Sequence, residues 1–466
     1  MLGLALAETR LGWSTVLSRS SVLLVLGLAL TVAVLLWLRV PGMNGSRFWD
    51  WPWRWLPILA VYPVMLAAAT PLFLALKLHH SRRCSAGLAL VLVTVSALAL
   101  ELGARRLQAR SNRFDGTAAI VFNPAMTSYF TDARRLVGQE DLLATFTREM
   151  PRLGHHSRTH PPGPVAFYVA LLSLFDSPRA AALAGAGLIA LLAALGVPAT
   201  FWMCRALDCA PDAALYAASC MALAPSVLLF FPSFDPVYPI FTAAILGSWA
   251  LALRTAHWKW AVACGVALAA GLFFAYNLLV LGAFFVVLSF FVVVRDGASA
   301  LRTGTVQAWL TLLTLIGVYL ACWLLTGFNA FETFRIALIN QQQLSAGYDR
   351  PWPDTVPSDL VDFVRGAGWA PALLAVFCLV DRLKRGVRQD PLGWIVVACL
   401  AQILVTALSG LLRVETARVW IFLMPLLMLP AGIELASWRP ADRAVAFGAI
   451  WLLLACSHQT VSFFQG

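Results

Sequence analysis

The chain has 466 residues, of which 60% are hydrophobic and 12% are charged, and its mean hydropathy is +0.78. Soluble domains carry roughly twice that charged fraction, so the composition excludes a water-soluble globular protein and a disordered chain. The net charge of +11 does not indicate a nucleic-acid partner, because Lys and Arg gather in the cytoplasmic loops of membrane proteins. We therefore expect an integral membrane protein.

Uncharged runs predict where the chain crosses the bilayer. A crossing needs about 20 residues in a helix, and the run 260–294 is long enough for two crossings with a break near Tyr276 and Asn277. This predicts an all-α polytopic membrane protein with about thirteen transmembrane helices. The runs are 20–38, 55–76, 84–100, 180–204, 213–234, 236–253, 260–294, 303–331, 366–380, 391–412, 419–433 and 444–466.

Two shorter segments decide the topology. Residues 161–175 begin with Pro-Pro-Gly-Pro, which leaves a helix of about 13 residues, so we expect this helix to be only partly inserted. Residues 366–380 are equally short, and we nevertheless require them to span. With the N-terminus inside, Lys and Arg after residue 180 are then about twice as frequent in the predicted inner loops as in the outer ones.

The charge pattern divides the chain into five regions. Acids, histidines and arginines concentrate in the two large loops, which both fall on the outer side, whereas a transporter usually keeps its polar residues at mid-membrane. This favours chemistry at the outer surface. The regions are the three N-terminal spans 1–103, the extracytoplasmic loop 104–179, the central spans 180–326, the second extracytoplasmic loop 327–367 and the C-terminal spans 368–466.

The first outer loop carries the densest polar pattern. It contains Tyr-Phe-Thr-Asp-Ala-Arg-Arg-Leu at 129–136, then an amphipathic stretch at 142–153 that predicts an interfacial helix, then His-His-Ser-Arg-Thr-His-Pro-Pro-Gly-Pro at 155–164. The spacing of His156 and His160 is compatible with a divalent cation, but the prolines that follow disfavour a helical metal site. The metal therefore stays undetermined, and the sequence indicates no other cofactor.

These motifs resemble the GT-C superfamily of integral-membrane glycosyltransferases, which includes bacterial aminoarabinose transferases and protein O-mannosyltransferases. The resemblance continues through Ala-Leu-Ala-Pro-Ser at 222–226, Phe-Asp at 234–235, Gly-Leu-Phe-Phe-Ala-Tyr-Asn at 271–277 and Arg-Val-Trp-Ile-Phe-Leu-Met-Pro at 418–425. The chain departs from the family in three ways. Ala133 follows Asp132 in place of a second acid, Tyr276 and Asn277 replace an expected Lys, and three spans precede the catalytic loop.

The resemblance implies roles for particular residues. Asp132 is the expected base that takes a proton from the acceptor, and Arg418 is the expected ligand of the departing lipid phosphate, with Arg158 as second choice. Glu415 lies three residues before Arg418 and is expected to orient it. The full set of expected substrate-binding residues is His156, Arg158, His160, Asp235, Tyr276, Asn277, Glu415 and Arg418.

The resemblance also implies a reaction. We expect transfer of a sugar from a polyprenyl-phosphate-linked donor to a glycan, lipid or protein acceptor, at a site that faces the periplasm or exterior of a bacterial plasma (inner) membrane. The expected partners are this donor, its acceptor and the lipid bilayer, and no nucleic acid is expected. Two alternatives stay open: a lipid-linked-sugar flippase or transporter, and a non-catalytic glycolipid-binding membrane protein.

Overall fold

The structure is a computed structural model that describes residues 2–108, 115–347, 349–386 and 390–462. In these ranges the chain is almost entirely helical, and a single small hairpin joins the two-residue strands β1 (Gly45–Ser46) and β2 (Trp49–Asp50). This confirms the expected all-α class.

The helices follow the expected order of spans and loops. The N-terminal part holds α1 (Leu2–Trp37), α2 (Ile58–His80), α3 (Ala86–Gln108), α4 (Asp115–Phe122), α5 (Tyr129–Leu136), α6 (Leu142–Glu149), η1 (Met150–Arg152), η2 (Ser157–Thr159) and α7 (Gly163–Leu174). The central part holds α8 (Pro178–Ala206), α9 (Pro211–Ala222), α10 (Pro225–Leu229), η3 (Asp235–Val237), α11 (Tyr238–Thr255), α12 (Trp258–Phe274), η4 (Tyr276–Leu281), α13 (Gly282–Asp296) and α14 (Ala298–Thr326). The C-terminal part holds α15 (Ala330–Ala346), α16 (Thr355–Ala367), α17 (Trp369–Arg385), α18 (Pro391–Ser409), α19 (Thr416–Val419), η6 (Ile421–Leu423), α20 (Met424–Ser437) and α21 (Pro440–Thr460).

The number of membrane spans is close to the predicted thirteen. Within the described residues, ten helical segments are long and apolar enough to cross a bilayer, and the bent pair α16–α17 makes eleven if it forms one span. Three apolar helices are shorter, namely α7, α12 and the segment Ile421–Ser437. Every one of the thirteen predicted segments contains a helix, and the chain is a multi-pass membrane protein.

Two local predictions agree with the structure. The long run 260–294 is interrupted where expected, because α12 ends at Phe274, Ala275 is extended, and a 3-10 turn begins at Tyr276. Residues 161–175 form only the 12-residue helix α7, which is shorter than the roughly 20 residues that a crossing needs. Its proline-rich start accounts for this, since proline supplies no amide hydrogen and favours the first turn of a helix.

The segment expected to span at 366–380 has a different form. Helix α17 begins at Trp369 and makes an angle of 109° with α16. The bend falls at Gly368, whose φ of +107° lies in a region that side chains with a Cβ rarely adopt. The second outer loop therefore ends in a helix that runs directly, through a sharp corner, into the next apolar helix.

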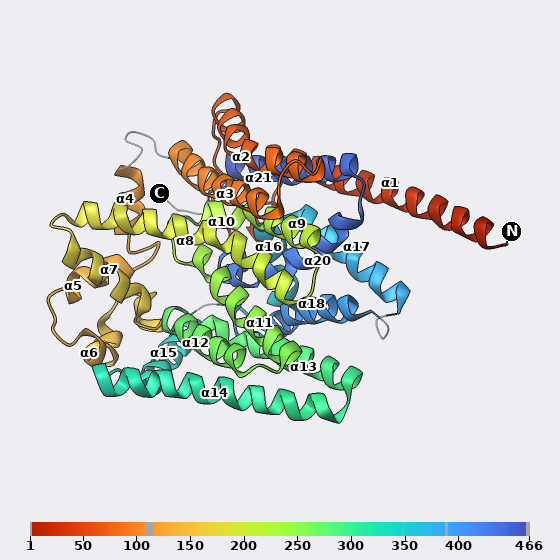
Figure 1. The fold of residues 1–466 in the computed structure, drawn as a ribbon. Coiled ribbons are helices and arrows are strands. Elements are labelled where there is room, and N and C mark those ends of the chain that lie inside the picture. Colours follow the sequence, from red (N-terminus) through yellow and green to blue (C-terminus); the bar gives the residue numbers. More distant parts are fainter. Residues whose placement is uncertain (1, 109–114, 348, 387–389, 463–466) are drawn as a thin grey trace.

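The amphipathic stretch of the first outer loop is a shorter helix than predicted. Helix α6 ends at Glu149 and the chain continues as the 3-10 turn η1, which contains Pro151. Its neighbour is α15, and the hydroxyls of Thr147 and Thr333 lie 2.7 Å apart. The two large loops thus pack against each other, and Figure 1 shows α6 and α15 side by side at the end of the bundle that holds α4 to α7.

The core of the bundle is built from α9, α11 and α20, which lie in the middle of the fold (Figure 1). Of the apolar stretch Pro211–Leu229, 94% is buried, against 6% of α14, which leaves α14 at the periphery. Helices α9 and α20 can approach closely because Gly432 has no Cβ. A Cβ at this position would lie only 2.4 Å from the Ala213 carbonyl oxygen. Since α11 and α20 also continue from the segments that hold the candidate site, that site adjoins the buried core of the fold.

Candidate active site

The centre of the site is an ion pair between two segments far apart in the sequence. The Arg418 Nε donates to Asp235 Oδ2 over 2.9 Å, and Arg418 Nη1 lies 4.0 Å from Glu415 Oε2. The Arg418 side chain is 14% exposed and that of Asp235 is 17% exposed. The guanidinium is therefore held in a partly desolvated position, where its interactions with anions are stronger than in water.

The backbone places both partners at starts of core helices. Asp235 opens η3, which continues into α11. Arg418 lies in α19, directly before η6 and α20, and it follows two residues with left-handed backbone, Val414 at φ 66° and Glu415 at φ 54°. Such a conformation is rare for side chains with a Cβ and requires support from surrounding contacts.

Aromatic and histidine side chains from the first outer loop complete the cluster. The Tyr129 ring lies 5.8 Å from the His160 ring, 6.2 Å from the His156 ring and 6.0 Å from the Phe234 ring. His160 Nδ1 lies 2.8 Å from the His156 carbonyl oxygen. Because a carbonyl can only accept, this ring nitrogen donates, which leaves Nε2 as an acceptor in the neutral ring. We name the six residues Tyr129, His156, His160, Asp235, Glu415 and Arg418 the Arg418 site.

Burial and the Arg418 charge keep the histidines neutral. Burial lowers the pKa of His156 well below its ordinary value of 6.5, and Arg418 and His160 lower it further. Burial also lowers the pKa of His160, although the Asp235 carboxylate opposes that shift. Both rings are therefore neutral hydrogen-bonding groups near neutral pH.

The pKa values of the charged groups Arg418 and Glu415 are raised, in contrast to those of the two histidines. Burial opposes the charged form of Arg418, but the Asp235 and Glu415 carboxylates outweigh it and hold the Arg418 pKa above its ordinary value. Burial raises the pKa of Glu415, and Arg418 only partly counters this. Glu415 is thus the site carboxylate whose basicity is moved towards neutral pH, which suits a group that accepts a proton.

Asp132 lies beside this cluster. It is one helical turn after Tyr129 on α5 and is 1% exposed. Its Oδ2 accepts from the Gly154 backbone N–H over 2.9 Å, and its Oδ1 lies 3.5 Å from Arg135 Nη1. In the described part of the chain, no hydrogen bond or ion pair joins the Asp132 carboxylate to Asp235, Glu415 or Arg418.

Asn277 contacts the Arg418 segment, because its Nδ2 donates to the Val419 carbonyl over 3.2 Å. Tyr276 lies further away, with its ring 5.0 Å from Phe334 on α15. The Arg158 backbone carbonyl accepts a hydrogen bond from Asn340 Nδ2 over 2.7 Å. Four buried polar atoms of the expected residues lack a hydrogen-bond partner within the described structure: His156 Nδ1, Arg158 Nε, Tyr276 Oη and Asn277 Oδ1.

The donor set does not fit a preformed metal site. Among the described residues, no three His, Cys, Asp or Glu side chains converge where they could hold one ion. The carboxylates of Asp235 and Glu415 lie beside the Arg418 guanidinium instead. We therefore derive no chemical step through a metal ion.

Sequence reasoning missed two contributions to the site. Tyr129 belongs to the motif at 129–136 but has no predicted role, although its position three residues before Asp132 puts both on one face of α5. Asp359 and Asp362 in the second large loop had no predicted role, yet on α16 they contact the chain just before Arg418. Their spacing of three residues indicates a shared helix face, but no sequence pattern identifies the segment that this face contacts.

The helical bundle is that of a multi-pass membrane protein, and comparison with solved structures assigns it the GT-C fold. Among solved structures, the chain is similar to an oligosaccharyltransferase from Archaeoglobus fulgidus tethered to an acceptor peptide containing the NVT sequon, with a TM-score of 0.53 and 12% sequence identity. The match covers 81% of this chain and 56% of the other, so this chain spans about half the length of that neighbour. It bears out the fold that the motifs predicted. No family model and no curated protein matches the sequence.

Proposed function

We propose that this protein is a glycosyltransferase that moves a sugar from a polyprenyl-phosphate donor to an extracytoplasmic acceptor in a bacterial inner membrane. The observation that carries the proposal is the convergence of the Arg418–Asp235 pair with two neutral histidines at the start of the core helices. The GT-C fold supports it, because the fold neighbour is itself an oligosaccharyltransferase.

Arg418 is the proposed ligand of the donor phosphate. Its described contacts use Nε and Nη1, and the guanidinium fork has a further nitrogen for a phosphate oxygen. A cation in a partly desolvated site stabilises the negative charge that develops on the leaving phosphate as the sugar–oxygen bond breaks. Asp235 and Glu415 orient the guanidinium from two sides.

The sugar is proposed to lie against the neutral polar groups of the site. His156, His160 and Asn277 surround the Arg418 segment, and Arg158 and Tyr276 lie on the adjoining segments. Buried polar atoms without partners cost free energy unless a ligand or water satisfies them. A hydroxyl-rich ligand such as a sugar supplies both the donors and the acceptors that these atoms need.

Asp132 is the proposed base, with Glu415 as the second candidate. Asp132 lies on the same helix face as Tyr129, but both of its oxygens already have contacts and it is 1% exposed. The Glu415 side chain is 25% exposed, and its pKa is raised. The two assignments of the base predict different activities for variants of Asp132 and Glu415, so testing both variants separates them.

The acceptor is proposed to be a glycan, a lipid or a protein. The fold neighbour was solved with an acceptor peptide, so a peptide is the first acceptor to test. A flippase or transporter of the same lipid-linked sugar, or a glycolipid-binding protein without catalysis, is separated from the enzyme by whether a new glycosidic product forms.

The test uses the full chain in liposomes with a panel of radiolabelled polyprenyl-phosphate sugars and with peptide, lipid and glycan acceptors. Wild type is compared with Asp132→Asn and Glu415→Gln. The control is Asp141→Asn, which removes an exposed carboxylate from the same loop.

Label in a product with wild type and Asp141→Asn, but not with Asp132→Asn, supports the proposal as stated. Loss of labelled product with Glu415→Gln and its retention with Asp132→Asn would assign the role of base to Glu415. Label that crosses the bilayer on its original lipid, without any product, overturns the enzyme in favour of a flippase. Bound donor that is neither moved nor transferred overturns it in favour of a glycolipid-binding protein.

A further inference from the structure

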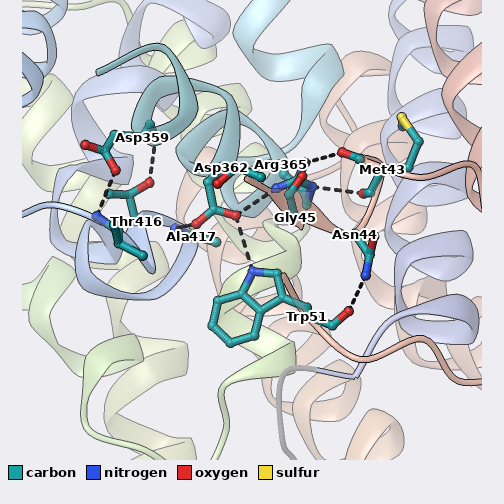
Figure 2. Close-up of polar contacts among 12 residues, drawn as sticks. Met43, Asn44, Gly45, Trp51, Asp359, Asp362, Arg365, Thr416 and Ala417 are labelled. Atoms are coloured by element: carbon teal, nitrogen blue, oxygen red, sulfur yellow. Dashed lines mark hydrogen bonds and ion pairs between the residues drawn. The ribbon is translucent and has the colours of Figure 1, made fainter. Parts of the chain in front are cut away.

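One face of α16 contacts the chain that leads to Arg418. Asp359 Oδ1 accepts from the Val414 N–H over 2.8 Å, and Asp362 Oδ2 accepts from the Ala417 N–H over 2.8 Å. The Thr416 hydroxyl donates to the Asp359 backbone carbonyl over 2.5 Å. Figure 2 shows these contacts between the α16 helix and the segment that carries Thr416 and Ala417.

The same face also provides close packing. The Phe363 and Trp420 rings lie 5.6 Å apart, and Trp420 is fully buried. A Cβ at Gly366 would lie 2.8 Å from the Ala417 carbonyl oxygen, so only a glycine allows this approach. One helix face carries residues 359, 362, 363 and 366, which follow the i, i+3, i+4, i+7 pattern. That face contacts the segment 414–420.

The second Asp362 oxygen connects this face to the N-terminal spans. Asp362 Oδ1 accepts from Arg365 Nη1 over 2.7 Å and from Trp51 Nε1 over 3.2 Å. Arg365 in turn donates to the backbone carbonyls of Met43 and Gly45 over 3.0 and 3.2 Å (Figure 2). The Arg365 and Asp362 side chains are 4% and 5% exposed, so this network is part of the interior.

The support is needed because the turn before Arg418 is unfavourable by itself. Val414 and Glu415 are consecutive non-glycine residues with left-handed backbone. Their conformation persists when neighbouring structure satisfies the local amides and fixes the chain. Asp359 binds the first amide of this turn and Asp362 binds the amide one residue before Arg418, so both act directly on the part of the backbone that sets the Arg418 direction.

We propose that α16 is the element that positions Arg418, with Asp359 and Asp362 as positioning residues and the Met43–Trp51 segment as a brace behind them. The claim about the backbone is independent of the reaction, whereas its effect on catalysis rests on the function proposed above. In this arrangement the three N-terminal spans are connected to the site through Trp51 and Arg365.

Hydrogen exchange of the full chain in nanodiscs tests the backbone claim. Asp359→Ala removes the acceptor of the Val414 amide and leaves the buried Asp362–Arg365 pair intact, so we expect the variant to fold. Exchange of the Val414 amide should rise at least about tenfold, because that amide loses its buried acceptor, and loosening of the turn should carry a smaller rise to the amides of 415–418. Asp359→Asn keeps a carbonyl oxygen at the same place and should restore exchange to within about threefold of wild type.

Asp354→Asn is the matched control, because Asp354 is exposed, precedes the same helix and makes no capping hydrogen bond. It should leave exchange in 414–418 unchanged. Equal exchange in wild type and Asp359→Ala would overturn the proposal. So would an increase of the same size in Asp354→Asn, since the effect would then follow from charge alone.

Donor kinetics test the catalytic consequence. With a donor that wild type uses, Asp359→Ala should raise the donor KM about tenfold with little change in the acceptor KM, and Asp359→Asn should recover the wild-type value. Faster exchange with unchanged donor kinetics would overturn the positioning role. A wild type that uses no donor would reject the proposed function instead, and hydrogen exchange would still decide the backbone claim.

Discussion

Arg418 and Asp235 are 183 residues apart in the sequence, and their side chains form a 2.9 Å ion pair at the start of two core helices. The pair joins the late segment of the chain to the start of α11, and both side chains are more than four-fifths buried. It fixes the distance between the two regions that the sequence motifs identified separately. Several measurable consequences follow from this contact and its surroundings.

The first concerns the identity of the cation. Arg418→Lys keeps the positive charge but removes the planar fork and the Nε hydrogen bond to Asp235. We expect sugar transfer to fall about 10- to 100-fold, mainly through the donor KM. Steady-state kinetics in liposomes measures this, with Arg335→Lys, an exposed residue on α15, as control. Equal kinetics for wild type and Arg418→Lys would exclude a bidentate role.

The second concerns the stability of the pair. Asp235→Asn removes the carboxylate charge beside Arg418, so the guanidinium keeps only the 4.0 Å contact to Glu415 as an ion pair. Removal of one partner of a buried pair is destabilising, and we expect a loss of about 2 kcal/mol in the free energy of unfolding. Thermal unfolding in detergent detects it as a lower midpoint. The double variant Asp235→Asn/Arg418→Gln should recover part of the loss, and a further loss in the double variant would contradict the account.

The third concerns pH. The pKa values of His156 and His160 are lowered in the folded protein, so below the ordinary value of 6.5 the unfolded chain binds more protons than the folded one. Stability therefore falls as the pH decreases below about 6.5. The unfolding midpoint at pH 5.5 should be lower than at pH 7.5, and His156→Gln/His160→Gln should reduce that difference. His80→Gln changes an exposed histidine and should not.

The fourth concerns the approach of α16 to the Arg418 segment. In Gly366→Ala, the new Cβ would lie 2.4 Å from Ser226 Oγ and 2.8 Å from the Ala417 carbonyl oxygen. We expect a loss of about 1–3 kcal/mol in stability, as for other overpacked sites, together with reduced transfer. Gly317→Ala in α14 has open space around its Cβ and serves as control. A stable and fully active Gly366→Ala protein would show that this contact is not required.

The sequence predicted the bundle well because its signals are local. Runs without charge locate the apolar helices, and the break at Tyr276 and the short helix α7 follow from residues within those segments. The 109° corner at Gly368 was not predicted, since hydropathy reports whether a segment is apolar and not its direction. The predicted stretch 142–153 is longer than α6 because apolar spacing alone ignores Pro151, which lies in the 3-10 turn after Glu149.

The site was predicted in part. Asp235, Glu415 and Arg418, which the family resemblance selected separately, lie together, and His156 and His160 lie with them, while their roles in the reaction stay predictions. The role of α16 could not be read from the sequence, because it arises from contacts between residues 55 positions apart. The same holds for Asp132, whose environment is set by Gly154 and Arg135 and is visible only in the folded chain.

The central claim is that Arg418 binds the phosphate of a polyprenyl-phosphate ligand, and equilibrium binding tests it most directly. A polyprenyl phosphate without a sugar is titrated into wild type and Arg418→Gln in nanodiscs, with the exposed Arg335→Gln as control. The account predicts binding to wild type and Arg335→Gln, and at least about tenfold weaker binding to Arg418→Gln, the loss of a charge-assisted contact. Equal affinity for all three proteins would contradict it.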